Sequence, residues 1–161
     1  MPVGAASWSF TEDDFGAITQ SLQRFLTETN ARCALLVDRN GQLVATVGEQ
    51  PNFDATAFAT LTAADFSAND QLAKLIGEKE FSSLFHQGEQ ESMYLADIAR
   101  RVILVILFDN RTTLGLVRLK VKQTVDELRA IFEKVFSRPA GGQGQSGLLS
   151  GADDEIDRLF Q

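Results

Sequence analysis

The chain has 161 residues, a length typical of a single domain; 44% of them are hydrophobic and 23% are charged. This composition excludes a chain that is disordered throughout, and the longest apolar run, Val102–Phe108, is far shorter than the ~20 residues of a transmembrane helix. A net charge of −7 argues against nucleic acid or an anionic membrane as partner. The N-terminal residues lack a basic, apolar leader and there is one cysteine, so we expect a cytoplasmic protein without a disulfide.

The first third of the chain is expected to form an arm, a helix and a hairpin. Residues 1–10 show no periodicity and are interpreted as a flexible arm. Thr11 and the acids after it are typical of a helix start, and apolar residues three and four apart continue to about Asn30. Two short apolar strands follow at residues 33–37 and 43–47, and the Asn-Gly pair between them favours a hairpin.

The remaining elements are a long helix, three strands and a final helix. The long helix is expected over residues 54–76, because the Gly77 that follows is a typical helix stop. Three strands are then expected, at residues 81–85, 93–98 and 102–108. Apolar spacing predicts a helix over residues 114–136, although residues 117–121 alternate as a strand would.

The helix expected over residues 54–76 carries two unlike stripes. Large apolar residues supply most of one face: Phe58, Leu61, Phe66, Leu72, Leu75 and Ile76. The other face holds small or short residues: Ala59, Ala63, Ser67 and Asp70. Because small residues allow another backbone to approach closely, we expect this second face to meet a partner. Packing under a loop of the same chain is the alternative.

The composition changes after Ser137, where a glycine-rich linker is expected over residues 138–152. The acidic segment that follows, residues 153–161, has three apolar residues on one helical face: Ile156, Leu159 and Phe160. A helix this short is marginal on its own in water, so we expect it to form on docking into a groove of a partner. Simple fraying is the alternative.

Motifs of the common enzyme classes are absent, including the P-loop, the dinucleotide fingerprint and the serine nucleophile elbow. His86 is the single histidine and is expected to make an ordinary hydrogen bond, while Cys33 is interpreted as a core residue. Arg111 follows the most apolar strand and is interpreted as part of a turn, with an arginine finger toward a partner's phosphates as the alternative. We therefore predict no catalytic residue, no cofactor and no metal.

Six stretches of the sequence carry a family resemblance. They are LVDRNGQL at 36–43, LTA at 61–63, LAKLIGE at 72–78, FHQG at 85–88, FDNRTTLGLVRL at 108–119 and DDEIDRLF at 153–160. Together they resemble the Roadblock (dynein light chain roadblock type) domain, in its branch of bacterial gliding-motility and polarity regulators. The resemblance implies an α/β (α+β) three-layer domain over residues 11–137, of order α-ββ-α-βββ-α. A five-stranded antiparallel sheet would lie between helices, followed by a flexible C-terminal tail.

The resemblance also implies a function. Two copies would pair through the third strand and the second helix, and the homodimer would bind a Ras-like small GTPase of the MglA type in its GTP form. It would stimulate GTP hydrolysis by repositioning the partner's switch regions without an arginine finger, and so control cell polarity and motility. A Roadblock scaffold that anchors a GTPase complex without changing hydrolysis is the alternative.

A contact surface for the GTPase follows from this expectation. On the second helix it comprises Ala63, Ser67, Asp70, Gln71 and Lys74, and in the tail Ile156, Leu159 and Phe160. The small side chains would allow close approach, and the longer polar ones would hydrogen-bond the backbone of the switch regions. The expected location is cytoplasmic, enriched at a cell pole, with neither nucleic acid nor membrane insertion involved.

Overall fold

The computed structural model describes residues 10–137, which contain three helices and five strands. In chain order these are α1 (Glu12–Thr29), β1 (Cys33–Asp38), β2 (Leu43–Gly48), α2 (Ala55–Leu75), β3 (Ser83–Gln87), β4 (Ser92–Ile98), β5 (Val102–Phe108) and α3 (Leu114–Phe136). The predicted order of elements is confirmed, although β3 begins at Ser83 rather than at Phe81. The predicted linker and tail, and all of the arm except Phe10, lie outside the described residues.

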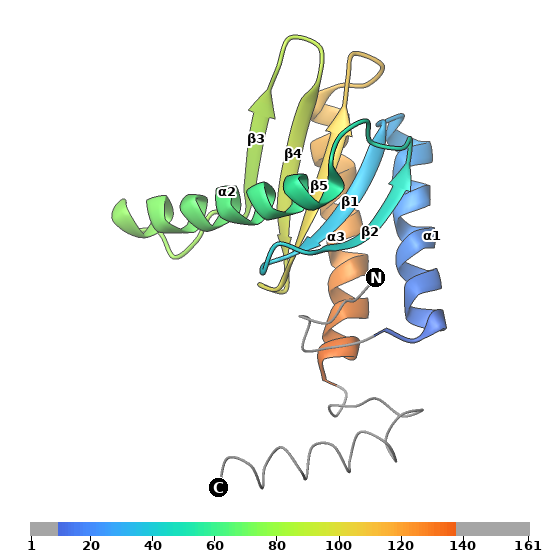
Figure 1. Cartoon of the computed structure of the whole chain (residues 1–161), viewed down its shortest axis with the longest axis horizontal. Helices are drawn as coiled ribbons and strands as arrows, with labels where there is room; N and C mark the ends of the chain where they lie inside the picture. The colour runs from blue at the N-terminus through green and yellow to red at the C-terminus, as the bar shows by residue number, and fades with distance from the viewer. Residues whose placement is uncertain (1–9, 138–161) are drawn as a thin grey trace, which may run out of the picture.

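The elements form three layers, as predicted. All neighbouring strands are antiparallel, in the spatial order β2-β1-β5-β4-β3, so that β2 and β3 are the edges. Helix α2 crosses one face of this sheet, and α1 and α3 lie side by side on the other face (Figure 1). Strand β1, which pairs with β2 on one side and β5 on the other, is buried at every position because helices cover both of its faces.

Helices α1 and α3 complete one face of the sheet together. A capping box begins α1, in which the Thr11 hydroxyl accepts from the Asp14 amide at 3.1 Å and the Asp14 carboxylate accepts from the Thr11 amide at 3.0 Å. Arg24 of α1 and Glu127 of α3 form an ion pair of 2.7 Å between the two helices. Fully or almost fully buried side chains fill the space beneath: Ile18, Leu22, Phe25, Leu128 and Phe132.

The ambiguous stretch at residues 114–136 is one helix, as predicted. Its first turn is capped by Thr113, whose hydroxyl accepts from the Leu116 amide at 3.2 Å. Val117 and Val121 are both buried on the side of α3 that faces the core. The alternating pattern there was misleading because positions four apart satisfy both a strand period of two and a helix stripe.

Each of the two stripes of α2 is partly buried and partly exposed. Ala59 is fully buried and Ala63 is only 8% exposed, whereas Leu72 and Leu75 are 58% and 81% exposed. The cause lies in the β1–β2 turn, where Gly41 adopts a positive φ of 93°, and a Cβ there would lie 3.3 Å from the Thr60 Cα. Small residues are therefore needed where α2 meets the turn. Of the large residues, Phe66 is buried, whereas Leu72 and Leu75 face outward.

Candidate functional site

The outward side of α2 is apolar. The exposed large hydrophobic residues of this helix and its C-terminal end are Leu61, Leu72, Leu75 and Ile76. The C-terminal end of the helix also extends past the outer strand β3 (Figure 1), so the sheet does not cover it. Exposed apolar residues gathered on one element are typical of a surface that another protein covers.

Strand β3 borders this helix end and is an edge strand of the sheet. It pairs with β4 on one side and forms the edge of the sheet on the other. Leu84 and Phe85 of this strand are only partly buried. Because the outer backbone groups of an edge strand have no strand partner, such an edge can pair with a second chain. We call the four outward residues of α2 together with β3 the α2/β3 surface.

The predicted contact residues on α2 fall into two groups. Ser67, Gln71 and Lys74 are exposed and lie four and three residues apart, so they share one stripe beside the outward leucines. Ala63 is buried against the β1–β2 turn, so in the single chain it offers little surface, and its contact with a partner stays a prediction. Asp70 is half-buried and its carboxylate is already bound within the chain. The predicted tail residues, Ile156, Leu159 and Phe160, lie outside the described residues.

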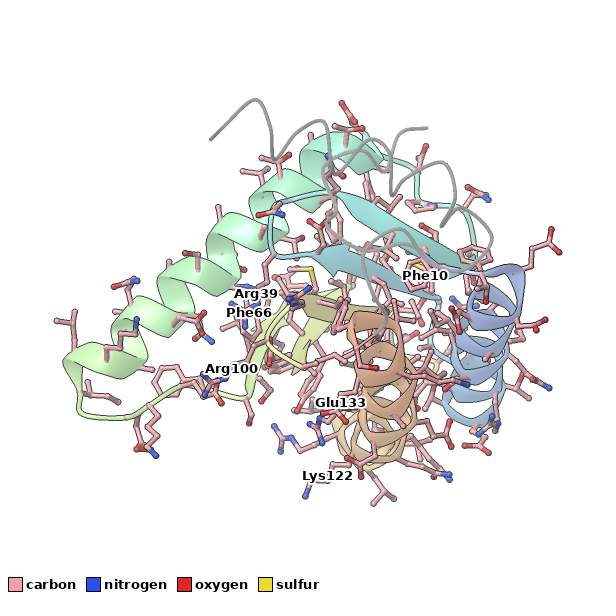
Figure 2. All side chains as sticks on the ribbon, turned by 90° about the horizontal axis from the view of Figure 1, so that it is seen from below. Phe10, Arg39, Phe66, Arg100, Lys122 and Glu133 are labelled. Carbon is pink, nitrogen blue, oxygen red and sulfur yellow. The ribbon has the colours of Figure 1, made fainter. Side chains whose placement is uncertain are left out.

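Asp70 belongs to an ionic cluster centred on Arg39 in the β1–β2 turn. Arg39 Nη1 donates to Asp70 Oδ2 at 2.6 Å, and its Nη2 donates to Asp97 Oδ1 of β4. The guanidinium carbon lies 4.8 Å from the centre of the Phe66 ring of α2, and Figure 2 shows the two labelled side chains next to each other. Burial lowers the pKa of Arg39, but hydrogen bonds to Asp97 and Asp70 outweigh this and hold the pKa above its ordinary value.

A second polar contact joins α2 to the edge strand. His86 Nε2 of β3 lies 2.6 Å from Asp65 Oδ2 of α2, and both side chains are partly open to solvent. The predicted ordinary hydrogen bond of His86 is therefore confirmed. The contact holds the two elements of the α2/β3 surface against each other.

Arg111 and Cys33 have structural environments. Arg111 donates to Asp109 at 3.0 Å and to Glu49 at 2.9 Å, and these hydrogen bonds lower the pKa of both carboxyl groups. Because two carboxylates of its own chain bind the guanidinium, the structure favours the turn interpretation. Cys33 is buried in β1, and burial raises the pKa of its thiol to about 11, so it is protonated at neutral pH.

The α2/β3 surface offers exposed leucines and a strand edge, and exposed polar side chains of α2 lie beside it; these groups are suited to binding protein. Within residues 10–137, no three side chains of the His, Cys, Asp and Glu types come together in an arrangement that would bind a metal ion. Among the helices of this described part, none combines the length and the apolar composition that crossing a bilayer requires.

Sequence reasoning missed Arg39 and Asp97, which hold α2 in place. Arg39 lies 31 residues from Asp70 and 58 residues from Asp97 along the chain, so no local pattern links the three. The signal that existed was the charge itself, since an arginine in a short hairpin turn beside a buried strand is close to the sheet. It could suggest a nearby carboxylate, but not which one.

Comparisons with known proteins show what this chain resembles. The model of the Roadblock/LC7 domain family matches residues 18–108. MglB of Myxococcus xanthus is 48% identical, with a TM-score of 0.71 over 74% of this chain and 98% of that one. The gliding protein MglB of Thermus thermophilus is 34% identical, with a TM-score of 0.74 over 80% and 97%. An MglB in a tetrameric arrangement is 33% identical, with a TM-score of 0.75 over 80% and 97%.

Proposed function

The chain belongs to the Roadblock/LC7 family, and from that premise we propose that it is a homodimeric GTPase-activating regulator of a Ras-like small GTPase of the MglA type. The observation that carries this proposal is the 48% identity to MglB over 74% of the chain. The protein acts in the cytoplasm, enriched at a cell pole, in the control of cell polarity and motility.

The α2/β3 surface supports the homodimer. Two copies that join their β3 edges form one continuous sheet, and the overhanging ends of α2 then lie beside each other. Leu72 and Leu75 would be covered in this arrangement. Each Å² of apolar surface that is removed from water stabilises the dimer by about 25 cal/mol. A symmetric pairing of this kind uses the same surface on both copies, as closed dimers do.

The exposed stripe of Ser67, Gln71 and Lys74 supports the contact with the GTPase. Their short or flexible polar side chains allow a loop of the partner to lie close to α2 and to hydrogen-bond there. Binding that favours the active geometry of the switch regions over the relaxed one shifts the partner toward the hydrolysing state. A thousand-fold faster hydrolysis requires only about 4 kcal/mol of such differential stabilisation. The chemistry is then supplied by the GTPase itself.

The first experiment measures GTP hydrolysis by the MglA-type GTPase of the same organism, with and without a twofold excess of this protein. Strong stimulation is expected. GTP-dependent binding without stimulation would instead identify a scaffold that anchors the GTPase. Absence of both binding and stimulation would overturn the proposal.

The tail is proposed as a second contact on the same GTPase. Ile156, Leu159 and Phe160 are apolar residues on an acidic segment that a linker of about 15 residues, with an r.m.s. span of roughly 20 Å, connects to α3. A tethered second contact raises affinity through its effective concentration. Deleting residues 140–161 is therefore expected to leave the dimer intact in light scattering and to weaken GTPase binding in calorimetry. A monomer, or unchanged affinity, would contradict this role.

A further inference from the structure

The attachment of α2 to the sheet changes along the helix. In its first half, Ala59 and Phe66 are fully buried in a cluster with side chains of β1 and β5. After Phe66, the buried residues of this fully described helix are Asn69 and Ala73, while Leu72 and Leu75 are exposed. Apolar burial therefore fixes the first half of α2 firmly and the second half only weakly.

Arg39 supplies the missing attachment at Asp70, one turn beyond Phe66. Its guanidinium joins three elements, because it extends from the β1–β2 turn and bonds Asp70 of α2 and Asp97 of β4. The two carboxylate side chains are only 24% and 14% exposed, so water competes weakly for these bonds. Charge-assisted hydrogen bonds in such partly dry positions are about twice as strong as neutral ones.

Several hydrogen bonds hold the sheet end of this connection. The Arg39 amide donates to the Arg101 carbonyl at 3.0 Å, and the Asp38 carboxylate accepts from two amides of the same turn at 2.9 and 3.1 Å. The second oxygen of Asp97 accepts from the Arg100 amide at 3.1 Å. Since both Arg39 and Asp97 are held by backbone contacts at this end of the sheet, the helix is the part that moves if the connection is lost.

The ionic contact lies directly beneath the proposed partner surface. Ser67 precedes Asp70 by three residues, and Lys74 follows it by four, so the half-buried Asp70 lies next to the exposed stripe. Gln71 is its immediate neighbour. Any tilt of α2 after Phe66 displaces all three exposed side chains at once. Precise placement of such groups matters because a displacement of about 1 Å can cost a hundred-fold in a rate that depends on alignment.

We propose that Arg39 is a positioning residue: by binding Asp97 of β4 and Asp70 of α2, it fixes the orientation in which the second half of α2 meets the GTPase. This inference rests on the proposed function, to which it adds a residue that does not itself touch the partner. It assigns Asp70 to the same task, in place of the direct contact expected from the sequence.

The experiment first measures amide hydrogen exchange in the full chain, which requires no partner. Asp70→Asn and Arg39→Lys are compared with Asp126→Asn, a matched control that removes an exposed carboxylate paired with Arg129 on α3. Both variants of the Arg39 contact are expected to speed exchange at residues 67–75 by about ten-fold, while amides of α1 and α3 are unchanged. Exchange at residues 67–75 that equals that of the control would overturn the proposal.

The second measurement follows GTPase stimulation as a function of regulator concentration, well below the melting temperature of each variant. Arg39→Lys and Asp70→Asn are expected to lower the stimulation reached at saturation by about ten-fold, whereas Asp70→Glu restores most of it. A residue that only stabilises the fold would leave saturated stimulation unchanged once the protein is folded. If Asp70→Asn lowered stimulation but Arg39→Lys did not, Asp70 would be a direct contact. If the wild type gave no stimulation, the proposed function would be wrong. The hydrogen-exchange data would still show whether Arg39 fixes residues 67–75 of α2.

Discussion

The two faces of the sheet are covered in different ways. On one face α1 and α3 pack against the strands and against each other, and they bury Phe25 and Phe132 completely. On the other face α2 is the one helix of residues 10–137 that crosses the strands; it contacts the sheet through small residues and Phe66, and leaves its leucines outside. The first face is completed within the chain, and the second is completed by another molecule in the proposed dimer. Stability and recognition are therefore assigned to opposite faces.

The largest expected effect on stability comes from a substitution in the core beneath α1 and α3. Phe132→Ala removes a ring that is fully buried and lies 5.6 Å from the rings of both Phe10 and Phe136. The lost burial and the cavity are expected to reduce the free energy of unfolding by about 3–5 kcal/mol. Urea unfolding measures the change. A loss below about 1 kcal/mol would mean that the α1/α3 face does not carry the stability of the domain.

The two faces can be tested against each other with one arginine substitution on each. Ser67→Arg adds a long charged side chain to the exposed stripe of α2, and Ala130→Arg adds the same side chain at an exposed position of α3. The α2 variant is expected to weaken GTPase binding at least about a hundred-fold, or roughly 2.7 kcal/mol, while the dimer persists. The α3 variant is expected to bind normally. Calorimetry measures the affinity of each variant for the GTPase, and light scattering measures its oligomeric state. Equal affinities of the two variants would show that the GTPase does not bind at α2.

The exposed leucines of α2 provide a test of the proposed dimer contact. We call the side of the sheet crossed by α2 the open face. Leu72→Ala shortens a side chain that is exposed in the single chain, so the unfolding free energy of the protomer is expected to change by less than about 0.5 kcal/mol. The dimer dissociation constant is expected to rise about ten-fold, since the leucine is covered in the pairing through β3 and α2. Analytical ultracentrifugation across a dilution series measures it. An unchanged constant together with a destabilised protomer would place Leu72 in the core instead.

The smallest expected effect concerns how dry the sheet is beneath α2. Cys33 lies in the cluster on that side, and burial raises the pKa of its thiol to about 11. Above about pH 9 the unfolded thiol releases its proton while the folded thiol keeps it, so stability falls as pH rises. Between about pH 8 and pH 10 the wild type is expected to lose about 1 kcal/mol more than Cys33→Ala. Urea unfolding of both proteins across this pH range measures the difference. If the unfolding free energies of the wild type and Cys33→Ala changed equally with pH, the thiol would be in contact with water beneath α2.

The elements that could be predicted from the sequence are those with local signals. The predictions for α1, the hairpin and β5 succeed because caps, an Asn-Gly turn and continuous apolar runs are local signals. Which residues of α2 are buried could not be predicted, because both of its stripes have helical spacing. The deciding fact is the position of Gly41 against Thr60, which belongs to the tertiary packing. The ionic contact through Arg39 is hidden for the same reason.

Two aromatic contacts bring the ends of the described domain together. Phe10, which precedes α1, and Phe136, at the end of α3, both pack on Phe132, with ring centroids 5.6 Å from it in each case. The described domain thus begins and ends at the same corner, on the side of the sheet away from α2. A domain whose ends meet can be inserted into a surface loop of another protein with entry and exit side by side. Carried in this way, it would still present its open face to solvent.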